Sequence, residues 1–516
     1  MRLRGLENVI TNKRVCIFRN TKACVRTGGM EEAPAFARQQ RKKAIMSLIS
    51  TEPKDAPRVG ERKPERGVET LAEAKTWLKE RGIEDIECIT PDLAGVARGK
   101  LMPADKFFSS TVMAMPSSVF TTTITGEYPE EDDTFQHDPS DGDVFLKPDF
   151  ATLTAVPWAS EPTAQIIHDA FHRDGRPFDL GPRQILRKIV GLYERDGLKA
   201  VVAPEIEFYL VKQNLDPDYP LEPPIGRSGR AEASRQSYSI QHVNEFDDLF
   251  DDIYEFSEKQ GLEIDTLIHE EGAAQMEINL RHGDPLALGD QVFSFKRTIR
   301  EAALRHKMYA TFMAKPMSRE PGSAMHIHQS VVDIETGRNI FSDNDGNPTA
   351  AFFSFIAGLQ KYLPAVMCIL APYVNSFRRL TRGTAAPINV HWGYDNRTVG
   401  IRVPNSGPGS RRVENRVPSS DANPYLAIAA SLACGRLGMQ QRLVPEEPIS
   451  GSARDLPFGL PRGLLEALAL FEDNDDLAEV FGPRFMATYR AIKQQEYETF
   501  MNVISSWERQ HLLLAV

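Results

Sequence analysis

Two glutamates, Glu205 and Glu207, stand two residues apart in the segment VVAPEIEFYLV, among β-branched and aromatic residues. Residues two apart in a β-strand project from the same face, so both carboxylates would share one side of the strand. Their mutual repulsion would be relieved by a bound cation. An isolated pair of this kind is more typical of a solvated edge strand, and the interpretation therefore depends on the other acidic residues.

Two further glutamates occur in the segment LIHEEGAAQMEINL. Glu270 lies seven residues before Glu277, so an unbroken strand would project the two side chains from opposite faces. A loop or bulge at residues 272–274 would return Glu270 to the side of Glu277. We therefore expect such a break if both glutamates serve one site.

Histidines and another glutamate follow in two more segments. His326 and His328 are two apart in MHIHQSVV, and RRVENRV places Arg412, Glu414 and Arg416 on one face if it is extended. Together, these strands offer a carboxylate-rich cage with one imidazole, which suits the hard cations Mg²⁺ or Mn²⁺ better than zinc. The candidate metal ligands are Glu205, Glu207, Glu270, Glu277, Glu414 and His326.

The segment 378–416 contains eight arginines and only two acidic residues. Arginines beside divalent cations suit phosphoryl transfer, because metals bridge phosphate oxygens while guanidinium groups neutralise the charge that develops on the transferred group. A solvated basic loop is the alternative interpretation. No P-loop or kinase-type glycine-rich loop is present, so a nucleotide would be held in another way. The residues alone indicate a two-metal, arginine-assisted phosphotransferase or ligase.

Composition excludes several other classes. The 516 residues are 41% hydrophobic and 26% charged, which allows a folded core in about two to four domains. The net charge of −10 makes nucleic acid and anionic membranes poor partners. The longest nearly apolar run, residues 362–374, contains two prolines and is shorter than the roughly 20 residues that span a bilayer. Five scattered cysteines without a C-x-x-C pair disfavour zinc clusters and disulfides, and favour a reducing, cytoplasmic location.

The hydrophobic periodicity along the chain predicts an α+β protein, and the first 68 residues differ from the rest in composition. Residues 1–68 are predicted to be a basic leader and disordered linker, with Met30 or Met46 as alternative starts. An amphipathic helix is expected over residues 70–82, and residues up to about 170 form a small, turn-rich α+β unit. Longer helices alternating with short strands then follow to the end of the chain. No internal repeat is visible.

Six ordered motifs resemble the catalytic domain of the glutamine synthetase family: APEIEFYL, HEEGAAQMEINL, FMAKPMSREPGSAMHIHQS, NSFRRLTRGTAAP, DNRTVGIRVP and RRVENRVPSSDANPYLAIAA. The resemblance implies a small N-terminal β-grasp domain over residues 69–170. It implies a large α/β catalytic domain with a curved antiparallel sheet over residues 171–516. It also implies a homo-oligomer of stacked rings, a dodecamer, with active sites between neighbouring subunits.

The same resemblance implies a role for each candidate residue, with Mg²⁺ or Mn²⁺ as cofactor and ATP and glutamate as substrates. One metal would be held by Glu207, Glu270 and Glu277, and the other by Glu205, His326 and Glu414. Glutamate would be bound by Arg379, Arg416 and the backbone of Gly322. Phosphate and nucleotide would be bound by His328, Ser330, Arg397, Arg402 and Arg412. The residues acting in catalysis would be Arg397, Arg379 and Glu270.

Departures from the family pattern concern the second substrate. Ala385 stands where glutamine synthetases carry a glutamate over the ammonium site, and Pro116 stands where a neighbouring subunit donates an aspartate. Neither side chain can attract a small cation or accept its proton. Arg454 replaces the tyrosine that some bacterial members adenylylate, so this control is expected to be absent.

These changes resemble the γ-glutamylpolyamine (γ-glutamylputrescine) synthetase branch of the family. The resemblance implies an ATP-dependent ligase that joins the γ-carboxyl group of glutamate to putrescine or a related amine through a γ-glutamyl phosphate. Two alternatives stay open at this point. One is an ammonia-using glutamine synthetase, and the other is a non-catalytic protein on the same fold.

Overall fold

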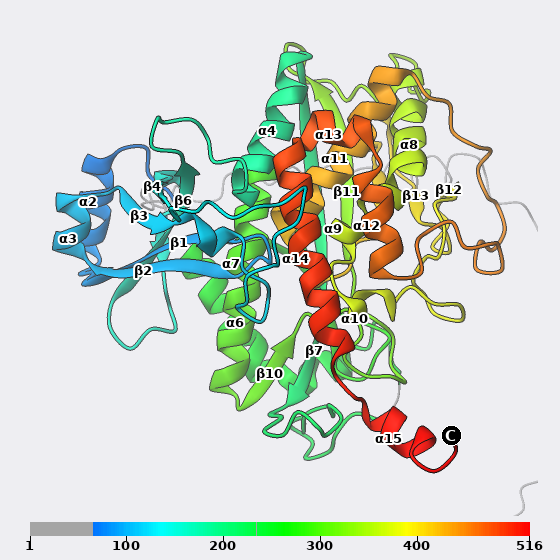
Figure 1. The fold of residues 1–516 in the computed structure, drawn as a ribbon, viewed down its shortest axis with the longest axis horizontal. Coiled ribbons are helices and arrows are strands. Elements are labelled where there is room, and N and C mark those ends of the chain that lie inside the picture. Colours follow the sequence, from blue (N-terminus) through cyan, green and yellow to red (C-terminus); the bar gives the residue numbers. More distant parts are fainter. Residues whose placement is uncertain (1–64, 234) are drawn as a thin grey trace, which may run out of the picture. The chain divides into compact units, whose positions relative to one another are not determined.

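The structure is a computed structural model, and it describes residues 65–233 and 235–516. The described residues belong to one compact unit. It contains two β-sheets with helices packed around them (Figure 1). The prediction of a basic leader and disordered linker falls almost entirely on residues 1–64, which lie outside the described residues.

The first sheet is built from short strands between residues 85 and 171. Its strand order is β2-β1-β6-β4-β3, with β5 beside β6; β1 and β6 pair in parallel and the other pairs are antiparallel. The strands are β1 (Asp85–Pro91), β2 (Ala97–Pro103), β3 (Met113–Pro116), β4 (Asp143–Pro148), β5 (Thr154–Ala155) and β6 (Thr163–Phe171).

Helix α2 (Leu71–Glu80) precedes this sheet, where the sequence pattern predicts a helix. The Thr70 side chain caps its first turn by accepting a hydrogen bond from the backbone N–H of Glu73. Ala74, Trp77 and Leu78 are buried on one face, as apolar residues spaced three and four apart in a helix should be. The short helix α3 (Ala104–Ser109) follows β2.

The second sheet is larger and carries the predicted site residues. Its strand order is β12-β13-β14-β11-β7-β9-β8, and β10 also pairs with β7. The strands are β7 (Leu198–Lys212), β8 (Ile264–His269), β9 (Gln275–Leu280), β10 (Met308–Thr311), β11 (Met325–Asp333), β12 (Trp392–Tyr394), β13 (Ile401–Val403) and β14 (Val413–Asn415). The long strand β7 contacts three neighbours and organises the sheet.

The expectation of an antiparallel sheet is wrong at one edge, where β12 and β13 pair in parallel. Two parallel neighbours need a connection that returns the chain to the same end of the sheet. Residues 395–400 provide this return, and it begins at Asp395 with a left-handed backbone (φ 45°). Every other strand pair of this sheet is antiparallel in the described part of the chain.

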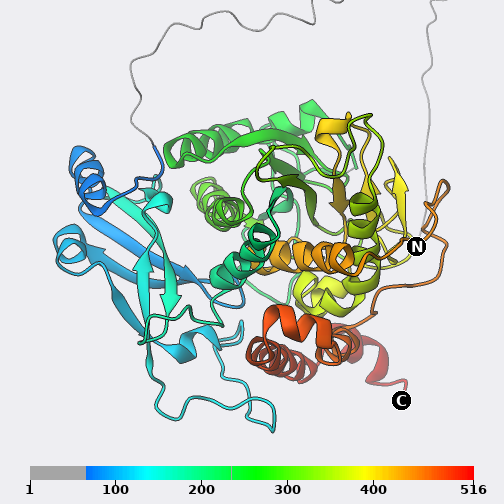
Figure 2. The ribbon, with the colours of Figure 1, turned by 90° about the horizontal axis from the view of Figure 1, so that it is seen from above.

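Helices cover the second sheet. Helices α4 (Pro182–Arg195) and α7 (Pro285–Arg305) contact β7, and α11 (Pro424–Gln441) packs against both of them and against α8 (Ala350–Tyr362). Figure 2 shows α4 and α11 side by side. Glycines allow the close approach of α8 and α11, because a Cβ atom on Gly358 would lie 2.7 Å from the Cα atom of Gly438.

One helical stretch, Ala350–Leu370, is long and apolar enough by length and composition to cross a membrane. It comprises α8, η4 (Leu363–Val366) and α9 (Met367–Leu370). In the structure, 78% of its most apolar window is buried inside the protein. Its apolar side chains therefore pack against the protein interior, mainly against α11.

The remaining helices connect or cover these layers. The α-helices are α5 (Ile240–Val243), α6 (Asp247–Gln260), α10 (Val374–Phe377), α12 (Leu464–Glu472), α13 (Asp475–Phe481), α14 (Pro483–Met501) and α15 (Ser506–Leu512). The 3₁₀ helices are η1 (Ser117–Phe120), η2 (Phe150–Thr152), η3 (Asn244–Phe246) and η5 (Pro408–Ser410).

A buried arginine joins the two sheet layers. Arg183 on α4 is 3% exposed and donates hydrogen bonds to three aspartates. Asp169 lies on β6 and Asp149 directly follows β4, and an oxygen of each is 2.6 Å from a guanidinium nitrogen of Arg183. Asp290 lies on α7, and its Oδ1 is 2.8 Å from Nε of Arg183. Separating a buried guanidinium from its carboxylate partners would leave unpaired charges in the interior, which is costly. This cluster therefore holds the two layers in one arrangement.

Candidate active site

Strand register brings the predicted acidic residues together on the second sheet. Glu207 on β7 lies directly opposite Glu277 on β9. Two residues away on β7, Glu205 lies opposite His326 on β11. Because residues two apart on a strand share a face, the four side chains form one group on that face.

The row continues outward across two more strands. His328 on β11 lies opposite Glu414 on β14, and Glu414 lies opposite Arg402 on β13. The paired site residues therefore share one face of the sheet, across the five neighbouring strands β9, β7, β11, β14 and β13.

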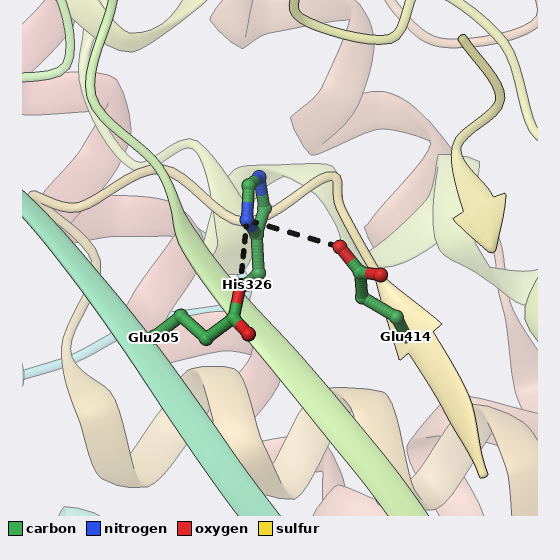
Figure 3. Close-up of side chains that lie close together, drawn as sticks. All are labelled: Glu205, His326 and Glu414. Carbon is green, nitrogen blue, oxygen red and sulfur yellow. Dashed lines mark hydrogen bonds and ion pairs between the residues drawn. The ribbon is translucent and has the colours of Figure 1, made fainter. Parts of the chain in front are cut away.

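Glu205, His326 and Glu414 form a group that could hold a metal ion, since one ligand atom from each lies within 4.8 Å of the others. His326 Nδ1 is 3.4 Å from Glu205 Oε2 and 3.9 Å from Glu414 Oε1. Figure 3 shows both carboxylates pointing toward the imidazole ring from β7 and β14. This is the same trio that the sequence predicts for one metal.

Glu207, Glu277 and His326 form a second group within the same 4.8 Å limit. The two groups therefore meet at His326. Glu270, which the sequence predicts as a ligand with Glu207 and Glu277, is outside this group in the described structure. Glu270 nevertheless lines a cavity that Glu207 and Glu277 also line. It is close enough to Glu207 that its charge helps to raise the pKa of the Glu207 carboxyl.

The expected break between Glu270 and Glu277 is present as a tight turn between β8 and β9. The Glu270 N–H donates to the Gln275 carbonyl at 2.8 Å, and the Gln275 N–H donates to the Gly272 carbonyl. Ala274 adopts a left-handed backbone with φ 56°. This turn lets Glu270 and Glu277 line one cavity although they are an odd number of residues apart.

Buried like charges strain this cluster. Burial, followed by the charges of Glu205, Glu207 and Glu270, raises the pKa of Glu277 to about 9. Burial and the charge of Glu270 raise the pKa of Glu207 to about 8. A divalent cation would neutralise the repulsion that the carboxylates exert on one another.

The pKa values of Glu205, Glu414 and His326, in contrast, are lowered. Burial disfavours the charged form of Glu205, but hydrogen bonds from His326 and His328 hold the pKa of this carboxyl well below its usual range. Burial likewise opposes ionisation of Glu414, yet the charge of Arg416 lowers its pKa to about 2. Burial and the charge of Arg416 lower the pKa of His326 to about 4, so its imidazole is neutral at pH 7. A neutral imidazole can bind a metal through its lone pair.

The ligand atoms in these two trios fit the divalent cation that the sequence predicts. Carboxylate oxygens dominate, and a single neutral imidazole joins both trios. Oxygen-rich sites of this kind suit Mg²⁺ or Mn²⁺, with the imidazole favouring the latter.

The arginines differ in how tightly the protein holds them. Arg379 is 2% exposed, and its guanidinium donates to the backbone carbonyls of Val417 at 2.8 Å and Arg416 at 2.9 Å. Arg416 also forms an ion pair with Glu414. These two arginines are therefore fixed in orientation before any substrate binds.

Three further arginines come from the edge of the sheet that β12, β13 and β14 form. Arg402 bridges Glu414 and Asp395 at 2.7 Å each. Arg412 Nε donates to His328 Nδ1 at 3.1 Å. Arg397 is exposed to solvent, although it lines the same cavity.

All but two of the predicted site residues line a single cavity of about 490 Å³. One exception in the described structure is Glu414, which is buried behind the wall and contacts His326, Arg402 and Arg416. The other is Ser330, which lies farther along β11, opposite Val201 on β7. Gly322 lies in the wall, where a Cβ atom would be 2.5 Å from the Ala314 carbonyl and 2.6 Å from Arg379 Cγ. Only glycine allows the backbone to approach Arg379 so closely.

The residues that depart from the family pattern lie in different places. Ala385 lines the cavity, and so does Arg454. Pro116 is exposed at the end of β3 and is not part of this cavity wall in the described residues.

Comparison with known proteins identifies the family. The profile described as "Glutamine synthetase, catalytic domain" matches residues 179–512. The chain belongs to the glutamine synthetase family. One relative is γ-glutamylputrescine synthetase PuuA of Escherichia coli (strain K12), which is 35% identical over 458 residues, covering 87% of this chain and 96% of the relative. Another is glutamate–isopropylamine ligase of a Pseudomonas species, 31% identical, covering 86% of this chain and 98% of the relative.

Solved structures agree with this membership of the glutamine synthetase family. The structure titled apo GmaS without ligand has a TM-score of 0.74 at 26% identity, and the match covers 87% of this chain and 100% of that one. A GmaS/ADP complex gives the same TM-score and identity over 86% of this chain.

Sequence reasoning missed several residues of this family member's cavity. Gln275 and Asn279 flank Glu277 at spacings of two, so strand alternation alone could have found them. Ser237 and Tyr238 also line the cavity, but they come from a connecting segment without periodicity. Nothing in their local sequence indicates this position.

Proposed function

We propose that this protein is an ATP-dependent ligase that joins the γ-carboxyl group of glutamate to an organic amine, putrescine or a related mono- or polyamine. The γ-phosphoryl group of ATP passes to the glutamate γ-carboxylate, which gives γ-glutamyl phosphate and ADP. The amine nitrogen then attacks the acyl carbon, loses a proton and displaces phosphate. The product is a γ-glutamyl amide.

The names of the two relatives support an amine as acceptor, since one is a γ-glutamylputrescine synthetase and the other a glutamate–isopropylamine ligase. The observation that carries the proposal for this chain is Ala385 in the cavity wall. A methyl group there supplies neither a negative charge to trap ammonium nor a base to deprotonate it. It leaves room for the carbon skeleton of a larger amine.

We assign glutamate to the buried end of the cavity. Arg379 and Arg416 are fixed by carbonyl and carboxylate partners, so their forks are oriented for a carboxylate ligand at little entropic cost. The Gly322 backbone next to Arg379 can approach the ligand because it carries no side chain.

We assign phosphate and nucleotide to the outer arginines and to His328, with Ser330 beyond the cavity as a nucleotide contact. Arg397, Arg402 and Arg412 would neutralise charge that develops on the transferred phosphoryl group. Glu207, Glu270 and Glu277 would hold one Mg²⁺ or Mn²⁺ ion, and Glu205, His326 and Glu414 another. When bound, these ions supply positive charge for the phosphate oxygens.

Further parts of the proposal concern assembly and location. Residues 69–170 are proposed to be a β-grasp domain and residues 171–516 the catalytic domain of a cytoplasmic homo-oligomer, a dodecamer of stacked rings. A C-terminal apolar surface supports association, because its side chains are exposed in the single chain. It lies at the end of α14 and around α15, next to the C-terminus (Figure 1). Its exposed side chains are Met501, Val503, Ile504, Trp507, Leu513 and Leu514. Pro116, exposed on β3, would face a neighbouring subunit's active site.

The test is an acceptor panel. The protein is incubated with glutamate, ATP and Mg²⁺ or Mn²⁺, together with putrescine, cadaverine, spermidine, ethanolamine, a monoalkylamine or ammonium. Released phosphate gives the rate and mass spectrometry identifies the amide. A γ-glutamyl alkylamide as main product supports the proposal, whereas glutamine as the main product would establish the ammonia-using alternative.

A further inference from the structure

The turn that returns Glu270 to the cavity is held by side chains rather than by backbone alone. Four consecutive backbone N–H groups, of residues 271–274, each donate to a side-chain oxygen. The acceptors, in order, are Glu270 Oε2 at 3.2 Å, Gln275 Oε1 at 3.0 Å, Glu320 Oε2 at 3.2 Å and Glu232 Oε2 at 2.6 Å.

Glu232 lies 42 residues before Ala274 in the sequence and makes the shortest of these four contacts. It lies in the segment that connects β7 to α5, and its side chain is only 6% exposed. Nothing in the proposed chemistry uses this buried carboxylate. Its position beside the turn therefore needs another explanation.

The Glu232 carboxylate contacts the chain on both sides of Glu270. One oxygen accepts the Ala274 N–H after it, and both oxygens lie within 3.1 Å of Nε2 of His269, the residue before it. The other ring nitrogen of His269, Nδ1, is 2.7 Å from the Glu270 carbonyl oxygen. Glu232, His269 and the turn thus form a closed frame around the Glu270 backbone.

Ala274 shows why this frame is needed. Its backbone is left-handed, with φ 56°, a conformation that costs a residue with a Cβ atom about 1 kcal/mol or more. The charge-assisted hydrogen bond from the Ala274 N–H to Glu232 offsets part of this cost. Without it, the turn could relax toward ordinary strand geometry, which would rotate Glu270 away from Glu277.

The same frame reaches the wall of the cavity. The Tyr238 N–H donates to the His269 carbonyl at 2.8 Å, and Tyr238 has a left-handed backbone of its own, with φ 61°. Glu232 and Tyr238 lie six residues apart on one connecting segment, which is therefore fastened to the β8–β9 hairpin at two points.

We propose that Glu232 is a positioning residue that sets the metal-binding geometry of Glu270 through His269 and the 271–274 turn. The inference rests on the proposed role of Glu270 as a metal ligand. A carboxylate that orients a ligand without touching the metal typically changes metal affinity by about 10- to 100-fold when it is removed.

The experiment measures Mn²⁺ binding directly, by electron paramagnetic resonance of free Mn²⁺ during titration of the intact protein, together with turnover against Mn²⁺ concentration. Glu232→Ala should weaken one of the two Mn²⁺ sites by about 10- to 100-fold and raise the Mn²⁺ concentration for half-maximal activity in parallel. Glu232→Gln keeps an oxygen for the Ala274 N–H but loses the charge that faces His269. Its effect should be intermediate.

Glu245→Gln is the matched control. Glu245 lies in η3, shortly after that segment, and accepts a hydrogen bond from the Ser228 N–H at 3.0 Å, away from the 271–274 turn. It should leave both Mn²⁺ sites unchanged. Thermal unfolding of each variant shows whether it is folded, and the isosteric Glu232→Gln decides the question if Glu232→Ala does not fold.

Glu270→Gln distinguishes a wrong ligand assignment for Glu270 from a wrong positioning role for Glu232. If Glu270→Gln leaves Mn²⁺ binding unchanged, the assignment of Glu270 as a ligand is wrong. If Glu270→Gln weakens one site while folded Glu232→Ala and Glu232→Gln bind Mn²⁺ as the unmodified protein does, the positioning role is overturned and the ligand assignment stands.

Discussion

Glu207 on β7 and Glu277 on β9 face each other across directly paired positions of neighbouring strands, and they are only 7% and 6% exposed. Two carboxylates at opposite positions of an antiparallel pair destabilise a sheet unless something neutralises them. Burial is the main cause of the raised pKa of both carboxyls, and the charge of Glu270 adds to it at Glu207, as those of Glu205, Glu207 and Glu270 do at Glu277. The pair is therefore the clearest sign in the fold that the sheet is built around a cation.

Glu277→Gln should lower turnover by more than about 100-fold while leaving the protein folded. The reason is that the loss of one carboxylate lowers metal affinity more than it disturbs packing. The amide is isosteric with a carboxyl whose pKa of about 9 keeps it neutral near pH 7, so the melting temperature without metal should not fall. Steady-state rates and calorimetry check both statements. Normal turnover in a folded Glu277→Gln protein would remove this residue from the site.

Strand alternation predicted much of the site, because a spacing of two puts side chains on one face whatever the fold. It found Glu205 with Glu207 and His326 with His328. The family resemblance, rather than this rule, supplied Ser330, which lies beyond the cavity wall in the described structure.

Other features had no local signal. Tyr238 and Glu232 act from a connecting segment whose path depends on contacts with the β8–β9 hairpin, and those contacts are distant in sequence. The parallel pairing of β12 and β13 also escaped prediction, since strands of three residues carry too little pattern to define a direction.

Arg379 and Arg397 should respond differently to substitution by lysine. Arg379→Lys loses a fixed, buried fork and should mainly raise the KM for glutamate, whereas Arg397→Lys should mainly lower kcat. Because the Arg379 guanidinium also satisfies two buried carbonyls, its variant should lose about 1–3 kcal/mol of stability. Kinetics with glutamate varied at saturating ATP separates the two. The reverse pattern would exchange the roles assigned to these arginines.

Lys296 on α7 gives a prediction about pH. Its Nζ donates to the carbonyl of Ala422 at 3.1 Å and to that of Ser420. Burial, followed by the charge of Arg300, lowers its pKa from 10.5 to about 7. Between these two pH values the unfolded chain binds a proton that the folded chain lacks, so this group makes stability rise as pH increases.

The slope due to Lys296 should approach about 1.4 kcal/mol per pH unit, between pH 7.5 and 9.5. Urea unfolding across this range measures it, and Lys296→Met should flatten the profile relative to the unmodified protein. An identical pH profile in both proteins would show that Lys296 keeps its proton when folded.

Ala385→Glu should change the preference between acceptors. The new carboxylate would stand in the cavity wall, where it hinders a longer amine and supplies a charge and a base for ammonium. The ratio of kcat/KM for an alkylamine to that for ammonium should therefore fall, while the KM for glutamate changes little. Ala385→Gln, which adds similar bulk without charge, distinguishes the two causes. A ratio that Ala385→Glu leaves unchanged would place the acceptor elsewhere.

The central claim, that the acceptor is an organic amine, is tested most directly by the ratio of kcat/KM for a four-carbon amine to that for ammonium in the unmodified protein. Burial of each methylene contributes about 0.8 kcal/mol, so four contribute about 3 kcal/mol. This corresponds to roughly 100-fold in affinity and, through transition-state binding, in efficiency. The account predicts a ratio of about 100 or more in favour of the alkylamine. A ratio below one would contradict it and identify the protein as an ammonia-using glutamine synthetase.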